Sequence, residues 1–161
     1  MARSTLIASL QLSLRSAVAA GLAVAVAQLL RFQFPIYALV SAVIVTDLSA
    51  ARTRQLALPR VVGTVLGATL GAVINPFVQP GAWAVGISVL AAMLLSHLLR
   101  LPDTAKLAGY VSGIVVINHG DHPWFYALHR VLETGVGIGL AVLVALVPKL
   151  IRIDGSTRQD S

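Results

Sequence analysis

The sequence lacks cysteine and has few charged residues. Without cysteine, disulfide bonds and thiolate chemistry are excluded. Charged residues make up only 11% of the chain and hydrophobic residues 57%, whereas ordinary soluble domains have about 25% and about 45–50%. A soluble domain of 161 residues needs a polar shell, and so few charges cannot build one. The composition therefore indicates an integral membrane protein.

Six apolar stretches follow one another along the chain. They cover approximately residues 12–30, 35–50, 60–77, 81–99, 105–117 and 127–147. A helix needs about 20 residues to cross the hydrocarbon core; four stretches fit, the second is marginal and the fifth is short. The first is long for the apolar region of a signal peptide, so we interpret it as a membrane helix. We predict one transmembrane domain of six helices with short cytosolic tails, residues 1–11 and 149–161.

Lysine and arginine are distributed unevenly between the two predicted faces. With the N-terminus in the cytoplasm, only Arg31 and Arg130 fall at the outer face, as the positive-inside rule requires. The inner face receives Arg3, Arg15, Arg52, Arg54, Arg60, Arg100, Lys106, Lys149, Arg152 and Arg158. Trp83 and Trp124 fall at predicted outer helix ends, where indole rings prefer to lie. We expect both termini in the cytoplasm, so topology explains the net charge of +6 without nucleic-acid binding.

Two segments of the chain resemble each other. RVVGTVLGATLG at residues 60–71 corresponds to RVLETGVGIGLA at residues 130–141, so that a shift of seventy places Arg60 on Arg130 and Thr64 on Thr134. The pattern predicts two repeats of three helices, about residues 12–78 and 81–148. Because three is an odd number, the second repeat must enter the membrane upside down. The expected fold is an all-α membrane protein with six transmembrane helices in two inverted three-helix repeats.

Glycines at helical spacing indicate close packing of helices in lipid. The candidate packing residues are Gly63, Gly67, Gly71, Gly135 and Gly137. The series in the last stretch does not match the G-x-G-x-x-G of a nucleotide loop, and no strand precedes it. We expect these glycines to pack the third helix against the sixth.

Charged side chains at membrane depth are costly unless they are paired or face water. Glu133 follows Arg130 by three residues, which fits either an ion pair within the helix or a gating or proton-coupling carboxylate. Asp47 either pairs with nearby arginines at the inner surface or serves the same coupling role. Lys106 either reaches the inner interface from a short helix or faces a path for anions.

A group of histidines and one acid near residue 120 raises the question of a metal site. The group consists of His119, Asp121, His122 and His129. Gly120 and Pro123 interrupt any helix there, and the spacing matches no recognised zinc motif. We expect exposed loop residues, an interfacial His97, and neither a metal nor a cofactor. Since motifs of hydrolases and nucleotide-binding proteins are also absent from the sequence, an enzyme is not favoured.

Several short motifs together resemble a known family. They are Pro35-Ile36-Tyr37, the arginine and glycine ladder at residues 60–71, Lys106, and Arg130-Val-Leu-Glu133-Thr134-Gly135. The sequence resembles the membrane module of the fusaric acid resistance and aromatic acid exporter superfamily, to which the plant aluminium-activated malate transporters are related. The resemblance covers about residues 12–148. It implies a six-helix module that passes organic anions, usually as a homo-oligomer.

The resemblance and the charges lead to one functional hypothesis. Lys106, Arg60 and Arg130, with the hydroxyls of Thr64 and Thr134, would attract and pass a small organic anion, because a cationic lining lowers the electrostatic barrier to its entry. The anion would be aromatic or dicarboxylic, and the direction export. Glu133 and Asp47 would carry protons if transport is coupled to a gradient.

The expected partners are the lipid bilayer, the anion and a second copy of the chain in a dimer. No nucleic acid is expected. We place the protein in the inner (plasma) membrane of a bacterium. The alternative hypothesis is an accessory or structural membrane subunit that needs a partner for transport.

Overall fold

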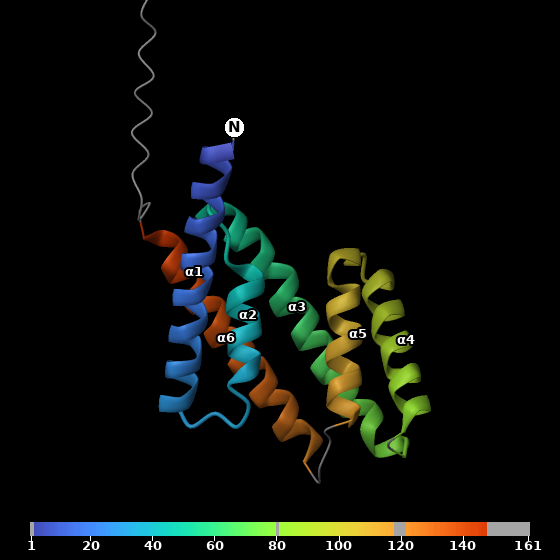
Figure 1. Cartoon of the computed structure of the whole chain (residues 1–161). Helices are drawn as coiled ribbons and strands as arrows, with labels where there is room; N and C mark the ends of the chain where they lie inside the picture. Colours follow the sequence, from blue (N-terminus) through green and yellow to red (C-terminus); the bar gives the residue numbers. More distant parts are fainter. Residues whose placement is uncertain (1, 80, 118–121, 148–161) are drawn as a thin grey trace, which may run out of the picture.

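The computed structural model describes residues 2–79, 81–117 and 122–147, and within these ranges the chain forms helices and no strand. The helices are α1 (Ala2–Leu29), α2 (Ile36–Val45), α3 (Ala50–Ile74), η1 (Asn75–Phe77), α4 (Ala82–Leu98), α5 (Pro102–Ile117) and α6 (Pro123–Leu146), of which η1 is a 3₁₀ helix. The predicted all-helical class is confirmed. The six α-helices run in alternating directions along the chain (Figure 1).

Several helix boundaries differ from the predicted ones, most of all the starts of α1 and α3, each ten residues earlier than predicted. α1 begins at Ala2, so that most of the predicted N-terminal tail belongs to this helix. α3 begins at Ala50, because the Ser49 side chain accepts a hydrogen bond of 3.1 Å from the backbone N–H of Arg52 and caps the helix. The first turns of α3 are polar, and an apolar run does not reveal them. Arg60 therefore lies inside α3, while the predicted C-terminal tail lies outside the described residues.

Three helical segments have the length and apolar composition to cross a membrane. They are Thr5–Leu29, Ala50–Phe77 and Pro123–Leu146. Ile36–Val45 and Ala82–Leu98 are apolar but shorter. At a rise of 1.5 Å per residue, α2 is about 15 Å long, which is half of a hydrocarbon core of about 30 Å. By length and composition alone, three spans are supported where the sequence predicted six.

The helices pack in two groups around a central pair. α1 and α2 pack against α6, α4 and α5 pack against α3, and α3 and α6 pack against each other (Figure 1). The third helix of each half of the chain therefore packs on the first two helices of the other half. Alanines fill the contact between α1, α2 and α6, and their small side chains let the helix backbones approach.

Two glycines hold the closest of these contacts. A Cβ atom added to Gly67 of α3 would overlap the carbonyl oxygen of Ala108 in α5, and one added to Gly137 of α6 would overlap that of Ala38 in α2. The expectation that the glycines pack α3 against α6 is therefore wrong. They pack each of these helices against the second helix of the other half.

The remaining candidate glycines divide into two kinds. Gly63 and Gly71 also lie against α5, where an added Cβ would come within 2.6 Å and 2.7 Å of the Cβ atoms of Leu107 and Val115. The prediction that Gly135 packs against another helix is wrong, since an added Cβ would meet no described atom within 4 Å. Its side of α6 is the exposed one.

The turns after α1 and α4 have the same backbone conformation. Arg31 and Arg100 both have a left-handed φ, 55° and 59°, at a position where helices usually end in glycine. In both turns the next N–H donates to the carbonyl five residues earlier, at 2.9 Å. The sequences correspond as well, because Leu29-Leu30 and Leu98-Leu99 precede the two arginines.

Candidate functional site

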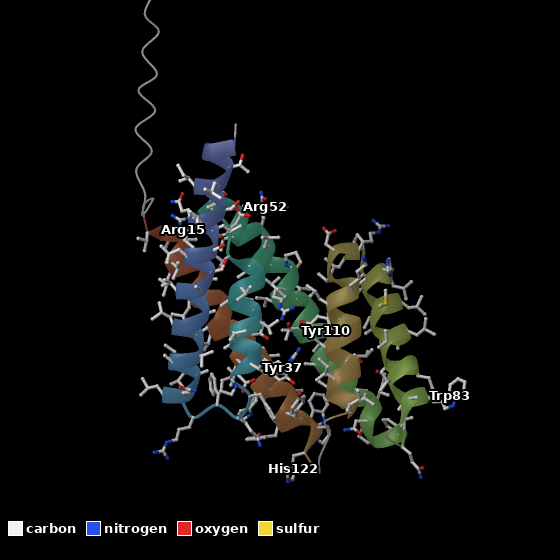
Figure 2. All side chains as sticks on the ribbon, viewed as in Figure 1. Arg15, Tyr37, Arg52, Trp83, Tyr110 and His122 are labelled. Carbon is white, nitrogen blue, oxygen red and sulfur yellow. The ribbon has the colours of Figure 1, made fainter. Side chains whose placement is uncertain are left out.

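Two buried arginines meet in the middle of the molecule. Arg60 of α3 and Arg130 of α6 are 1% and 2% exposed, and their guanidinium carbons lie 5.4 Å and 5.7 Å from the ring centroid of Tyr110 in α5. The ring centroid of Tyr37 in α2 lies 3.3 Å from the guanidinium carbon of Arg130. Figure 2 shows both tyrosines between α2 and α5. We name these four residues the arginine–tyrosine centre.

This meeting corrects the predicted positions of the two arginines. The sequence placed Arg60 at the inner face of the membrane and Arg130 at the outer face. In the structure both arginines lie inside their helices, Arg60 ten residues after the first residue of α3 and Arg130 seven residues after the first residue of α6. Since α3 and α6 run in opposite directions and pack on each other, both side chains reach the same ring.

The guanidinium groups have more donors than partners. Nε and Nη2 of Arg60 both donate to Oγ of Ser41 in α2, at 3.3 Å, whereas its Nη1 has no partner among the described residues. Nε and Nη1 of Arg130 likewise have no described partner, and all three nitrogens are buried. Buried charged donors are costly when left unpaired. Unused N–H groups of arginine are also the groups that bind carboxylates.

Glu133 places a carboxylate next to this centre. It is 0% exposed and lies three residues after Arg130 on the same face of α6. Its Oε1 accepts a hydrogen bond of 2.8 Å from the backbone N–H of Phe34, and its Oε2 has no partner among the described residues. Because the buried Arg130 nitrogens are also without partners, these atoms do not form the hydrogen-bonded ion pair that the sequence favoured.

An aromatic cluster covers the centre near the start of α2 and α6. The hydroxyls of Tyr37 and Tyr126 are 2.6 Å apart. The ring of Phe34 packs edge-on against Tyr126, with centroids 5.1 Å apart, and lies 5.9 Å from Tyr37. We name Phe34, Tyr37 and Tyr126 the aromatic cluster.

A cavity of about 430 Å³ reaches Arg60 from the other end of the molecule. It lies between the end of α2, the first half of α3 and the start of α5, and its lining is Ile44, Arg52, Gln55, Leu56, Pro59, Arg60, Asp103 and Leu107. Pro59 lies inside α3 and has no N–H to donate to the carbonyl of Gln55 one turn earlier. Figure 2 shows Arg52 at the end of the molecule away from His122.

The two predicted threonines differ in what their hydroxyls do. Both Thr64 and Thr134 are buried, one turn after the two arginines. Oγ1 of Thr64 donates to the carbonyl of Arg60 at 2.8 Å, a common use of threonine in membrane helices. Oγ1 of Thr134 has no partner among the described residues, so its hydroxyl is available at the centre.

Lys106 and Asp47 lie away from the centre. Lys106 is exposed on α5 and does not line the cavity that reaches Arg60. Oδ1 of Asp47 accepts from the N–H of Ser49 at 3.2 Å, and the Asp47 N–H donates to Oγ1 of Thr53 at 3.0 Å. These bonds shape the turn between α2 and α3 and give Asp47 a local structural role.

The histidines do not form a site in the part of the chain that the structure describes. No group of three or more histidine and acidic residues that could hold a metal ion occurs there. The ring nitrogens of His97 and His129 each lie near a carbonyl one turn earlier in their own helix. His119 and Asp121 lie outside the described residues.

Sequence reasoning missed Arg15 as a buried residue. It is 2% exposed, and it donates from Nη1 to the carbonyl of Leu48 at 2.8 Å and from Nη2 to that of Val147 at 2.9 Å. Arg15 thus ties α1 to the chain just beyond the ends of α2 and α6. The sequence feature that could have indicated its burial is its position as a lone arginine in an apolar stretch. No comparable signal pointed to Tyr110 or Ser41.

The family of the protein follows from a match over most of its length. A family model described as Aromatic acid exporter family member 1 matches residues 11–147. The chain belongs to this family. Membership confirms the resemblance seen in the motifs. The family is one of membrane transporters and not of enzymes, and it indicates an integral membrane protein that transports organic acids. Comparisons with curated proteins and with solved structures find no match.

Proposed function

We propose that the protein exports a small organic anion, and that the anion crosses at the arginine–tyrosine centre. One observation carries the proposal. Two buried arginines from different halves of the chain face one tyrosine ring and keep buried N–H groups that have no partner among the described residues, and one of these arginines lines the cavity.

The chemistry of the centre suits a carboxylate attached to a flat ring. Guanidinium groups bind carboxylates through paired, charge-assisted hydrogen bonds, and Arg60 and Arg130 both have free donors. Tyr37 and Tyr110 supply ring faces and edges on which an aromatic group can pack. The free hydroxyl of Thr134 adds a donor. An aromatic monocarboxylate would use all of these groups.

The cavity gives the anion its entry. The exposed Arg52 and the buried Arg60 both line it, together with Asp103. We propose that the two positive charges lower the barrier to entry of an anion. On the other side, the aromatic cluster covers Arg130. We therefore propose that the anion enters from the cavity and that the aromatic cluster closes the path beyond the centre. Release would need the aromatic cluster to move.

The charges favour the cavity end as the cytosolic one. Arg52, Arg54, Arg100 and Lys106 are exposed at the start of α3 and in and after the turn between α4 and α5, whereas Arg31 is exposed at the opposite end. Trp83 and Trp124 are 87% and 56% exposed near the starts of α4 and α6, as expected of interfacial rings. Entry from this side fits export.

We also propose that all six α-helices cross the membrane as two inverted repeats. The closest contacts support this proposal. Gly67 and Gly137 are seventy residues apart, and so are their contact partners Ala38 and Ala108, so that the same contact occurs twice with the two halves exchanged. The helix pairs follow the same exchange. The turns after α1 and α4 also share one backbone conformation, although Arg31 and Arg100 are one position away from a shift of seventy. Thr46, which is extended after the last residue of α2, would lengthen its reach.

The assembly and location belong to the same proposal. Large apolar side chains are exposed on every α-helix, and such surfaces need lipid or a protein neighbour. We propose a homodimer in the inner membrane of a bacterium. Glu133, with its buried and unpartnered Oε2, is better placed than Asp47 to respond to a bound anion.

Reconstitution of the purified protein into liposomes tests the function. We expect uptake of labelled benzoate above that of protein-free liposomes, and we expect Arg60→Gln or Arg130→Gln to lower it by about tenfold or more, since each loses charged hydrogen bonds to the anion. Arg54→Gln is the matched control, because Arg54 is exposed on α3 and outside the cavity lining. Absence of uptake by the wild type under every gradient would contradict the proposal and favour an accessory subunit.

A further inference from the structure

The geometry points to Glu133 as the residue that sets the charge of the transported anion. The inference rests on the proposed function and adds to it: with Glu133 present, the centre accepts a monoanion and rejects a dianion of similar shape.

The formal charges that are buried around the centre form a small set. In the part of the chain that the structure describes, the buried charged side chains are Arg15, Arg60, Arg130 and Glu133. Arg15 is held by two carbonyls beyond the ends of α2 and α6, so it does not belong to the centre. Two positive charges and one negative charge remain there. One bound monoanion makes this enclosed set neutral, and a dianion leaves it negative.

The contacts of Glu133 are those of an ionised carboxylate. Its Oε1 accepts from the N–H of Phe34 at 2.8 Å, and the guanidinium of Arg130 lies one turn earlier on the same face of α6. The N–H of Phe34 and the positive charge of Arg130 both favour the ionised form of this carboxylate. We therefore count one negative charge at Glu133.

Other titratable groups lie near the centre but outside its buried charges. His129 precedes Arg130, and its Nδ1 lies 3.0 Å from the carbonyl of Phe125. The hydroxyls of Tyr37 and Tyr126 share one hydrogen bond. Arg52 and Asp103 belong to the open cavity, where water and salt screen them. The net charge of the buried centre is therefore set by Arg60, Arg130 and Glu133.

Because the centre is buried, its net charge makes it selective between a monoanion and a dianion. A unit charge that lacks a counter-charge is costly in a low-dielectric interior, and two unit charges a few ångströms apart interact strongly there. A second carboxylate on the ligand would lie within reach of Glu133 without a third cation to meet it. Neutralising Glu133 removes this repulsion and leaves two arginines for two carboxylates.

A matched pair of ligands tests the inference. We would measure binding of benzoate and of phthalate to the purified full-length protein in detergent, at a pH where both compounds are fully ionised. The wild type is expected to prefer benzoate. Glu133→Gln, which keeps the oxygen that accepts from Phe34, is expected to change the benzoate-to-phthalate affinity ratio by about tenfold or more in favour of phthalate. Glu133→Asp keeps the charge and is expected to keep the preference for benzoate.

A double variant separates charge balance from local damage. Arg60→Gln combined with Glu133→Gln restores the net charge of the wild-type centre, and we expect its affinity ratio to return toward benzoate relative to Glu133→Gln alone. If Glu133→Gln, alone and combined with Arg60→Gln, keeps the benzoate-to-phthalate affinity ratio of the wild type, the inference is wrong while the proposed transport stands. If the wild type binds and transports neither compound, both fail.

Discussion

The three buried arginines differ in how their N–H groups are used. Arg15 donates to two backbone carbonyls from different parts of the chain, whereas Arg60 reaches one serine hydroxyl and Arg130 lies against tyrosine rings. The two hydrogen bonds of Arg15 connect segments that are distant in sequence. The buried N–H groups of Arg60 and Arg130 that have no partner among the described residues remain open to a ligand. We therefore give Arg15 a structural role and propose that the other two arginines bind the anion.

This division predicts opposite effects on stability and transport. Arg15→Gln is expected to lower the free energy of unfolding by about 2 kcal/mol, because two charge-assisted hydrogen bonds are lost. Arg60→Gln is expected to leave stability unchanged or raised, since it removes an incompletely paired buried charge, while uptake falls. Thermal unfolding in detergent and benzoate uptake per folded molecule are the two measurements. Equal losses of stability in both variants would contradict the division.

Sequence alone could find the charges of the centre but not the groups around them. Arg60, Arg130 and Glu133 interrupt apolar runs, and burial of a charge in a membrane is unusual enough to be informative. Tyr37, Tyr110 and Ser41 are ordinary residues of apolar helices. Their contacts with the arginines depend on how four helices are rotated and paired, which no local pattern encodes.

At the scale of helices, glycine spacing shows which face of a helix packs but not its neighbour. The ladder along α3 predicted a close contact, and a close contact exists. Its partner is α5, not the predicted α6, because the third helix of each half exchanges places with its counterpart. The six helices themselves could be predicted from apolar runs and breaker residues. The start of α3 could not, since its first turns are held by the Ser49 cap.

The contact between α6 and α2 gives a sharp test of this packing. Gly137→Ala is expected to lower the free energy of unfolding by about 2 kcal/mol or more, because the new methyl group would overlap the backbone of Ala38. Gly135→Ala is the control on the same helix. It meets open space and is expected to be neutral or to stabilise by up to about 1 kcal/mol, as alanine favours helix. Thermal unfolding of both variants in detergent decides, and an equal loss in both would refute the close contact.

At the scale of the whole molecule, the packing explains how two halves can share one site. α3 and α6 each leave their own half and pack on the other, so that their arginines arrive from opposite ends at Tyr110. In a tandem repeat of parallel halves, α3 and α6 would run in the same direction, whereas they run in opposite directions and pack on each other. In inverted halves, equivalent positions come together only near the middle of the membrane, and the two arginines do come together. These directions are the physical reason to favour inversion over a simple tandem repeat.

The proposed topology can be tested by labelling, because the chain contains no cysteine. Single cysteines would replace Gln33, Ser49 and His122, which are all exposed and precede α2, α3 and α6. If all six helices cross, a membrane-impermeant maleimide added to intact cells should label the variants at Gln33 and His122, and should label that at Ser49 only after permeabilisation. If only the three long segments cross, α2 does not separate Gln33 from Ser49, and both should react from the same side. That result would overturn the inverted repeat, because a first half with two crossings, α1 and α3, leaves the second half in the same orientation.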